Sequence, residues 1–372
     1  MDDDELEAEG LYDPAVDDPW RGDLVRRCLE IGLTVEQIRG AGDELIDRAV
    51  QRIHDVGDQR LTLADVADRA GVPASRVEQI ARANGRLVGP GLDERIFSEH
   101  DVEAMSTVGP MFHFLGEDAA LQMVRASAAA VARIGDAIIS AFLTGVAAPA
   151  MRDDESGLRL LEANRVGAEL MPKFGEMLTE MLRRYLQQSY RSSSDVSLKS
   201  ALADGVDARQ LAIGFADLVG STTLADSRSL ADLNAALDAF ERTATDTIAA
   251  KGGRVVKFIG DEVMFRADSA DIACELAVDL VDAVRSDPLL PPLRVGVAFG
   301  EVLSREGDFY GPIVNLAARV TKLAPLHGVV VTLHTTDALQ TRDAFTIHPL
   351  GAIEMHGLTD PVELAALSSR PS

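Results

Sequence analysis

Apolar residues recur at three- and four-residue spacing through most of the first half of the chain, between residues 23 and 190, with few β-branched runs. This spacing predicts α-helices almost throughout that half. Beyond about residue 207, short apolar runs alternate with helical segments. Strands are predicted at 211–216, 254–258, 262–266, 293–302 and 328–333, and helices at about 228–251, 269–286 and 313–324. The pattern therefore predicts an all-α domain followed by an α+β domain.

The elements of the second half follow the order βαββαβ, which is the ferredoxin-like split motif. A two-residue turn at Gly260-Asp261 can close the second and third strands into a hairpin. The segment between the halves is rich in Ser, Gly and Asp, which is typical of a linker. We therefore predict a disordered acidic tail at 1–20, a helical domain at 21–188, a linker at 189–207 and an α+β domain at 208–372.

The composition limits the partners of such a protein. The chain has 372 residues and a net charge of −24, which repels the phosphates of nucleic acids and of anionic lipids. Cys28 and Cys274 stand far apart without metal-ligand spacing, so neither a zinc site nor a disulfide framework is indicated. The N-terminus is acidic where a secretory signal would be basic and then apolar. These observations predict a cytoplasmic protein.

The longest apolar stretch, residues 126–150, is rich in alanine and is interrupted by Arg133 and Asp136. Each of these charges would cost roughly 2.5–3.5 kcal/mol at the centre of a bilayer. We therefore predict a buried helix of a soluble protein here, and no membrane span.

Two aspartates in the second half stand at the ends of apolar strand-like runs. Asp217 follows the run LAIGFA, and Asp261 lies at the tip of the predicted hairpin. Carboxylates at adjacent strand ends supply the hard oxygen ligands that Mg²⁺ prefers. Either one alone is an ordinary turn aspartate, but together they indicate a two-metal site for phosphoryl transfer.

Further polar residues are ambiguous when each is taken alone. The Gly220-Ser221-Thr222 turn suits either phosphate binding or helix capping, and Lys257 suits an edge strand from which its ammonium reaches solvent. Asn315 and Arg319 are four residues apart, so one helix face presents both to the same ligand. Arg319 is suited to stabilise charge on a transferring phosphoryl group, although an exposed ion-pairing arginine is the simpler reading.

Taken together, these segments resemble the class III nucleotidyl cyclases over about residues 208–368. FADLVGST is similar to the first metal-aspartate motif of the family, KFIGDEVMF to the second, and GDFYGPIVNLAARV to the segment that recognises the base and stabilises the transition state. The helical domain ahead of them resembles that of soluble actinobacterial adenylyl cyclases, in which the helical part restrains catalysis and responds to pH.

The resemblance implies a role for each residue. Asp217 and Asp261 would bind two Mg²⁺ (or Mn²⁺) ions, and Asn315 and Arg319 would orient the ribose and stabilise the transition state. Lys257 and Asp308 would select the purine: adenine has an acceptor at N1 and a donor at N6, which a lysine and an aspartate complement, whereas guanine reverses this pattern. The implied substrate is ATP. Such sites lie between two catalytic domains, so the resemblance also implies a homodimer with two equivalent interfacial sites.

One position departs from the family pattern. In IEMHGLTDPVEL many relatives carry a lysine before the glycine, which the resemblance implies as a triphosphate contact, and here that position is His356. A histidine is cationic mainly in acid, so a phosphate contact and a structural role both remain open for this residue.

The helical half offers several regulatory candidates. Protonation of His54, His100 or His113 is one predicted switch, and an apolar effector such as a fatty acid at residues 126–148 is another. The helix predicted at 157–187 abuts the linker and is the element we expect to dimerise and to set how the catalytic domains meet.

Residues 61–86 resemble a helix-turn-helix, whose second helix carries Arg76, Arg82 and Arg86. The acidic surroundings argue against DNA binding. We therefore predict an adenylate cyclase that converts ATP to cyclic AMP and pyrophosphate under the control of the helical domain. The alternative is a non-enzymatic, nucleotide-sensing regulator that binds DNA through residues 61–86.

Overall fold

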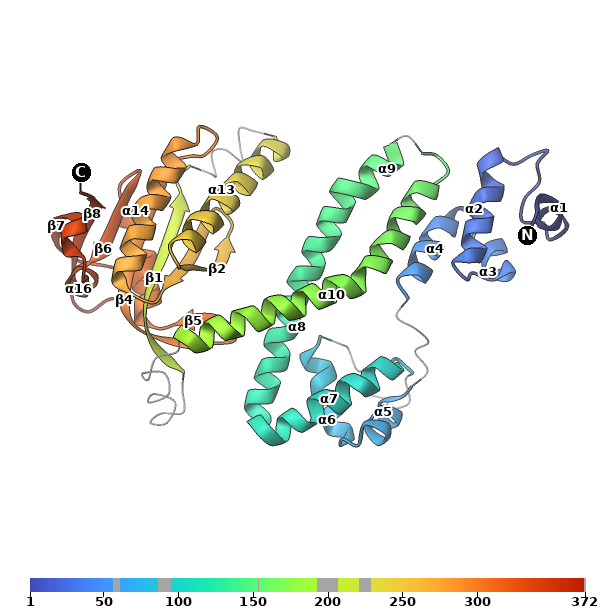
Figure 1. Ribbon diagram of the computed structural model, residues 1–372, viewed down its shortest axis with the longest axis horizontal. Helices are drawn as coiled ribbons and strands as arrows, with labels where there is room; N and C mark the ends of the chain where they lie inside the picture. The colour runs from blue at the N-terminus through green and yellow to red at the C-terminus, as the bar shows by residue number, and fades with distance from the viewer. Residues whose placement is uncertain (56–60, 86–94, 153, 193–206, 221–228, 371–372) are drawn as a thin grey trace. The chain divides into compact units, whose positions relative to one another are not determined.

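The computed structural model describes residues 1–55, 61–85, 95–152, 154–192, 207–220 and 229–370 (Figure 1). It divides into two compact units, Met1–Gln187 and Gln188–Ser372. Most of the predicted linker, at 193–206, lies outside the described residues, as do Ser221 and Thr222 of the predicted phosphate turn. The first unit is helical and the second combines helices with one sheet, as the sequence pattern predicted.

The first helical cluster lies at the N-terminus and contains five short helices. They are α1 (Asp3–Ala8), α2 (Pro19–Glu30), α3 (Val35–Arg39), η1 (Gly42–Glu44) and α4 (Leu45–Ile53). Leu161 of the long helix α10 (Leu158–Ser192) completes their core. This cluster therefore joins segments that are more than 100 residues apart in the sequence.

The prediction of a disordered tail at residues 1–20 is wrong. Asp2 and Glu5 form a reciprocal capping box at the start of α1, and Leu6 is fully buried in the first cluster together with Leu11 and Tyr12. The acidic run that suggested disorder places negative charge in the first helical turn, where the helix dipole favours it. The buried side chains of Leu6, Leu11 and Tyr12 therefore fix this acidic segment to the core.

The second helical cluster is built by α5 (Leu63–Ala70), α6 (Ala74–Ala83), α7 (Glu99–Leu115) and the start of α8 (Glu117–Phe142). Gly71 ends α5 in the left-handed conformation, at φ +66°, and so makes the tight turn into α6. Val66, Val77 and Phe97 are among the buried residues of this core. The predicted pair of helices at 61–86 is thus present, except for Arg86, which lies outside the described residues.

The long apolar helix is largely exposed, which corrects the prediction that it is buried. α8 continues through the π-helical turn η2 (Leu143–Ala147) into α9 (Ala148–Arg152), and only 6% of its most apolar window is buried in the chain. The first helical core includes no residue of this helix and the second includes only Val124, and Val131 and Ile139 remain 64% and 58% exposed. By length and composition alone this helix is able to cross a membrane. The cytoplasmic location remains a prediction.

The second unit contains the predicted βαββαβ motif. Its elements are β1 (Ala208–Leu218), α13 (Leu230–Ala250), β2 (Arg254–Ile259), β3 (Glu262–Ala267), α14 (Ala270–Ser286) and β4 (Leu293–Arg305). The neighbouring strands in the order β2-β3-β1-β4 are antiparallel, as the ferredoxin-like motif requires.

Further elements extend this motif along one edge. They are β5 (Asp308–Tyr310), α15 (Pro312–Leu323), β6 (Gly328–Thr332), α16 (Leu333–Asp337), η3 (Arg342–Ala344), β7 (Phe345–Ile353) and β8 (Val362–Ser369). β6 joins β4 in parallel, β8 and β7 follow it, and β5 pairs with the far end of β4. Of these, the sequence pattern predicted α15 and β6 but not β5, α16, η3, β7 or β8.

Helices cover both faces of the sheet. α13 and α14 lie side by side over one face (Figure 1), and residues such as Phe240, Leu276 and Val295 form the core beneath them. α15 packs on the other face, where Gly296 of β4 faces it: a Cβ at Gly296 would stand 2.2 Å from the backbone nitrogen of Thr321. This missing side chain lets α15 lie directly on the sheet and brings its polar face to the strand ends.

Candidate active site

Asp217 lies at the end of β1, opposite Arg294 of β4 and Glu262 of β3 in the sheet register. It is only 6% exposed. Its Oδ2 accepts hydrogen bonds from Arg294 Nε at 2.7 Å, from the Arg294 Nη2 group, and from Lys322 Nζ at 3.1 Å. Burial of a carboxylate is costly unless it is paired, so these two cations compensate Asp217 and hold its side chain in one orientation.

Asp261 lies beside Asp217 in the turn between β2 and β3. Its backbone oxygen accepts a hydrogen bond from Leu218 N at 3.2 Å, and Gly260, at φ +64°, supplies the left-handed residue that closes the turn. The structure thus brings the two aspartates of the predicted metal site to neighbouring strand ends.

Glu262 adds a third carboxylate next to this pair. Burial raises the pKa of Glu262, the ammonium of Lys322 lowers it, and the charges of Asp217 and Asp261 raise it again, with a net upward shift. Lys322 Nζ lies 3.4 Å from Glu262 Oε1 and so bridges Glu262 and Asp217. Sequence reasoning missed Glu262, Arg294 and Lys322. The adjacency of Glu262 to Asp261 was the available signal.

The donor atoms at this position fit a magnesium or manganese ion. Asp217 and Asp261 offer hard carboxylate oxygens, and Mg²⁺ in nucleotide sites is bound by one or two carboxylates together with substrate phosphates and water. Among the described residues there is no group of three or more His, Cys, Asp or Glu side chains arranged to hold a metal ion on their own.

Lys257 and Asp308 form an ion pair between β2 and β5, with side chains 42% and 25% exposed. Asp308 Oδ1 also accepts a hydrogen bond from the backbone nitrogen of Phe309 at 2.9 Å, which fixes the carboxylate. A β-bulge between Val255 and Lys257 breaks the simple alternation that the sequence suggested for this strand. The structure therefore brings together the two residues expected to recognise the base.

Asn315, Arg319 and Lys322 lie along one stripe of α15, since positions four and seven residues apart share a helix face. The opposite face carries the buried residues Ala317, Val320 and Thr321. Arg319 Nη1 is buried without a hydrogen-bond partner within the described chain. Such an unsatisfied donor is costly unless a ligand supplies the acceptor, which is consistent with a phosphate-binding role.

The aspartates and the Lys257–Asp308 pair are held at different ends of β4. Arg294, near the start of this 13-residue strand, faces Asp217, whereas Arg305, at its end, faces Asp308. One copy of the chain therefore presents a carboxylate group and a base-selecting group separately. The pairing of carboxylates with a polar helix on a βαββαβ sheet defines the nucleotidyl cyclase class of catalytic domain.

Comparison with known proteins agrees with this class. Residues 206–367 match the adenylate and guanylate cyclase catalytic domain, and residues 3–190 match the adenylate cyclase regulatory domain. An adenylate cyclase of Streptomyces coelicolor is 36% identical over 77% of this chain and 74% of its own length. The chain belongs to the class III nucleotidyl cyclase family and carries the adenylate cyclase regulatory domain ahead of its catalytic domain.

The chain is also similar to a second adenylate cyclase and, in its catalytic domain, to a solved structure. A pH-sensitive adenylate cyclase of Mycobacterium tuberculosis is 27% identical over 92% of this chain and 87% of its own length. The crystal structure of the catalytic core of a rhodopsin-guanylyl cyclase with converted specificity, in complex with ATPαS, covers 44% of this chain and 99% of its own, at 20% identity and a TM-score of 0.41.

Two arginines of the helix-turn-helix-like segment form contacts within the helical unit. The guanidinium of Arg76 lies 4.0 Å from the ring centroid of Phe112, and its Nη2 is 3.5 Å from Glu117. Arg82 pairs with Glu78 one turn earlier on α6. Since α6 also packs on α8, these contacts favour a structural role for the segment over DNA phosphate binding.

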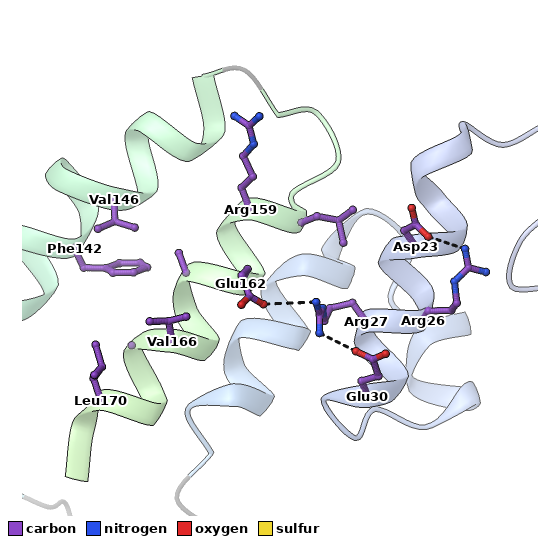
Figure 2. Close-up of a pocket in the computed structure, with 13 residues that line it drawn as sticks. Asp23, Arg26, Arg27, Glu30, Phe142, Val146, Arg159, Glu162, Val166 and Leu170 are labelled. Atoms are coloured by element: carbon purple, nitrogen blue, oxygen red, sulfur yellow. Dashed lines mark hydrogen bonds and ion pairs between the residues drawn. The ribbon is translucent and has the colours of Figure 1, made fainter. Parts of the chain in front are cut away.

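A separate pocket of about 950 Å³ lies in the helical unit between α2, the α8–η2 region and α10 (Figure 2). Phe142, Val146, Val166 and Leu170 form an apolar wall on one side, as Figure 2 shows. Charged residues line the other side, where Arg27 pairs with Glu30 and lies 3.6 Å from Glu162. The lining is thus amphipathic, with an apolar side and a charged side.

Proposed function

We propose that this protein is an adenylate cyclase that converts ATP to 3′,5′-cyclic AMP and pyrophosphate. The observation that carries the proposal is the Lys257–Asp308 ion pair in a catalytic domain of the cyclase family. The ammonium can donate to the N1 acceptor of adenine, and the carboxylate can accept from its N6 amino group. Guanine, with a donor at N1 and an acceptor at O6, meets like partners at both positions.

The remaining residues divide the chemistry between them. Two Mg²⁺ or Mn²⁺ ions, when held by Asp217 and Asp261, supply the Lewis acidity that favours ionisation of the ribose 3′-hydroxyl and neutralises the triphosphate. Asn315 orients the ribose for attack. The 3′-oxygen forms a bond to the α-phosphorus as the bond to pyrophosphate breaks, and Arg319 donates hydrogen bonds to the charge that develops there.

We also propose that the enzyme acts as a homodimer with two equivalent interfacial sites. The location of the two residue groups at opposite ends of β4 supports this, because a second copy can supply the group that the first lacks. Exposed apolar side chains on α8 and α10 supply a surface for dimerisation. They include Val131, Ile139, Leu170, Met181 and Leu182, each more than half exposed.

The catalytic assignment is tested by replacing the metal-binding carboxylates in the full-length protein. Asp261→Asn and Asp217→Asn should each lower cyclic AMP production from ATP by about 1,000-fold, because charge stabilisation at the reacting phosphate is lost. Asp246→Asn, at an exposed carboxylate on α13 of the same domain, is the matched control and should retain normal turnover. Ordinary turnover by Asp217→Asn or Asp261→Asn would show that the metal assignment is wrong.

Regulation by the helical domain belongs to the same proposal. His54 Nε2 lies 2.9 Å from Asn164 Oδ1 and so links α4 to α10, while His100 and His113 are exposed. Arg52 and Asp55 are the charged neighbours of His54 on its own segment, and they pair with each other. Protonation of His54 would change the α4–α10 link and thereby bias α10, which leads towards the catalytic domain. An unchanged pH–activity profile in the triple His54, His100 and His113 substitution would contradict this mechanism.

We further propose that the amphipathic pocket is where a fatty acid binds. Its apolar wall suits an acyl chain, and the arginines at its charged side suit a carboxylate. Phe142 and Val146 belong to the stretch that the sequence singled out for an apolar effector. Activity that does not respond to added fatty acid, together with purified protein free of lipid, would contradict this part of the proposal.

A further inference from the structure

Asp217 has two cationic partners that differ in how firmly each is held. Arg294 lies directly opposite Asp217 in the sheet register, and its side chain is 26% exposed. Lys322 reaches the same Oδ2 atom from α15, and its side chain is 52% exposed. Arg294 is thus fixed by the strand ladder, whereas the Lys322 ammonium sits at the end of a flexible, half-exposed stem.

The position of Lys322 Nζ is that of a cation between two carboxylates. It is 3.1 Å from Asp217 Oδ2 and 3.4 Å from Glu262 Oε1. A divalent ion bound by that Asp217 oxygen needs the same space and the same lone pairs. An ion that binds Asp217 through Oδ2 therefore competes with the ammonium for that oxygen atom.

We propose that Lys322 is a built-in counter-ion that occupies Asp217 in the metal-free enzyme and must be displaced when the metal binds. The proposal rests on the assignment of Asp217 as a metal ligand in the function proposed above. Lys322 is then a positioning residue: it keeps the Asp217 carboxylate aimed at the site, and it weakens metal binding until a nucleotide brings further ligands.

α15 does not need Lys322 for its own placement. Thr321 packs against Gly296, and its hydroxyl donates to the backbone oxygen of Ala317 at 2.9 Å and lies 3.3 Å from that of Phe215, while Val320 is fully buried. Removal of the Lys322 ammonium should therefore leave the helix on the sheet. Lys322 shares a stripe of α15 with Asn315 and Arg319. When it is released from Asp217, its ammonium therefore becomes available on the same face of the helix as these two residues.

The test is Mn²⁺ binding to the full-length protein without nucleotide, measured by electron paramagnetic resonance of the free ion. Lys322→Met keeps the apolar stem and removes the charge, so it should bind Mn²⁺ about 3- to 30-fold more tightly than the parent protein, as expected for loss of one competing ion pair. Lys322→Arg restores a cation and should bind about as the parent does.

Lys251→Met is the matched control. Lys251, the residue that follows α13, lies 2.8 Å from Asp279 and 3.7 Å from Glu275. Both carboxylates are on α14, so Lys251 too bridges two carboxylates of the same domain. The substitution makes the same change in net charge, and Mn²⁺ affinity should stay within about twofold of the parent. Thermal melts in EDTA and in Mn²⁺ give a second readout, in which Mn²⁺ should raise the melting temperature more for Lys322→Met than for Lys251→Met.

Asp217→Asn separates this proposal from the one on which it rests. If Asp217→Asn loses Mn²⁺ binding and Lys322→Met binds no more tightly than Lys251→Met, the counter-ion role of Lys322 is overturned while the metal site stands. If Asp217→Asn binds Mn²⁺ as the parent does, the metal assignment itself fails, and the Lys322 proposal fails with it.

Discussion

The guanidinium of Arg319 lies against the backbone of Gly357, so closely that a Cβ atom at residue 357 would stand 3.3 Å from Nη2. Gly357 belongs to the loop between β7 and β8 and has φ +78°. Its neighbour is His356, the residue that departs from the family pattern. The loop thus forms one wall of the space in which the proposed transition-state residue is held.

Gly357→Ala should lower kcat for cyclic AMP formation by about 10-fold with little change in KM, because the added methyl group shifts a side chain that acts mainly in the transition state. Gly351→Ala is the matched control: Gly351 lies on β7 with φ +82° and has nothing within 4 Å of a Cβ. Both changes should cost about 1 kcal/mol of stability from backbone strain. Equal kcat values for the two variants would show that the contact with Arg319 has no catalytic effect.

Exchange of the base-selecting pair should change the preferred nucleotide. In the double variant Lys257→Glu with Asp308→Cys, the carboxylate can accept from guanine N1 and the thiol can donate weakly to O6. We expect kcat/KM for ATP to fall by at least about 100-fold and the ratio of GTP to ATP turnover to rise, as assayed by cyclic GMP and cyclic AMP production. Asp308→Asn alone should lower ATP use without favouring GTP. An unchanged preference in the double variant would refute the assignment of this pair.

The sequence predicted the central motif because its signals are local. Each of the strands from β1 to β4 contains a run of mostly apolar residues, and the Gly260-Asp261 turn can be recognised from two residues. β7 was missed because Pro349 and Gly351 interrupt it, and the register shift between them marks the bulge that accommodates both. The order of the N-terminal segment was missed because its acidic composition suggested disorder, although a few buried apolar residues anchor it.

The residues of the candidate site also divide into those that the sequence predicted and those that it did not. Asp217, Lys257, Asp261, Asp308, Asn315 and Arg319 stand in motifs that can be quoted from the chain, so all six were named from the sequence. The partners of Asp217 were not, because Arg294 and Lys322 follow it by 77 and 105 residues and meet it only through strand register and helix packing. Burial of the apolar helix was predicted wrongly for a related reason: periodicity shows an apolar surface but not what covers it.

Asp271 provides a pH-dependent anchor for the loop that follows α16. Burial, the largest single influence, raises the pKa of Asp271, but hydrogen bonds from the Thr341 hydroxyl and from the backbone amides of Thr341 and Gln340 outweigh it, so the pKa is lowered. A lowered pKa stabilises the folded state above the unfolded value of about 3.9, and this stabilisation is lost as the pH falls through the folded pKa.

Asp271→Asn should therefore lower the free energy of unfolding by about 1 kcal/mol at pH 7, and the difference from the parent should shrink below about pH 4. Urea titrations at several pH values, followed by far-ultraviolet circular dichroism, measure both effects. Asp360→Asn replaces an exposed carboxylate and should follow the parent curve at every pH. A constant difference between Asp271→Asn and the parent down to pH 3 would contradict the linkage.

The two cysteines report separately on the two domains. Cys28 lies in the first helical core and Cys274 in the core beneath α14, and both are fully buried. Burial raises the pKa of Cys28 to about 11 and that of Cys274 to about 12. Because the thiolate is the reactive form, each native thiol should react with a disulfide reagent at pH 8 at least about 100-fold more slowly than an exposed cysteine with a pKa of about 8.5.

Single-cysteine proteins made by Cys28→Ser or Cys274→Ser allow each domain to be followed as urea is raised. Cys28 should become reactive when the helical domain opens and Cys274 when the catalytic domain opens, so the two labelling midpoints should differ if the units unfold independently. Asp360→Cys, in a background without the native cysteines, gives the exposed reference rate. Labelling of either native cysteine at that reference rate without urea would mean that its core opens freely, contrary to the packing around it.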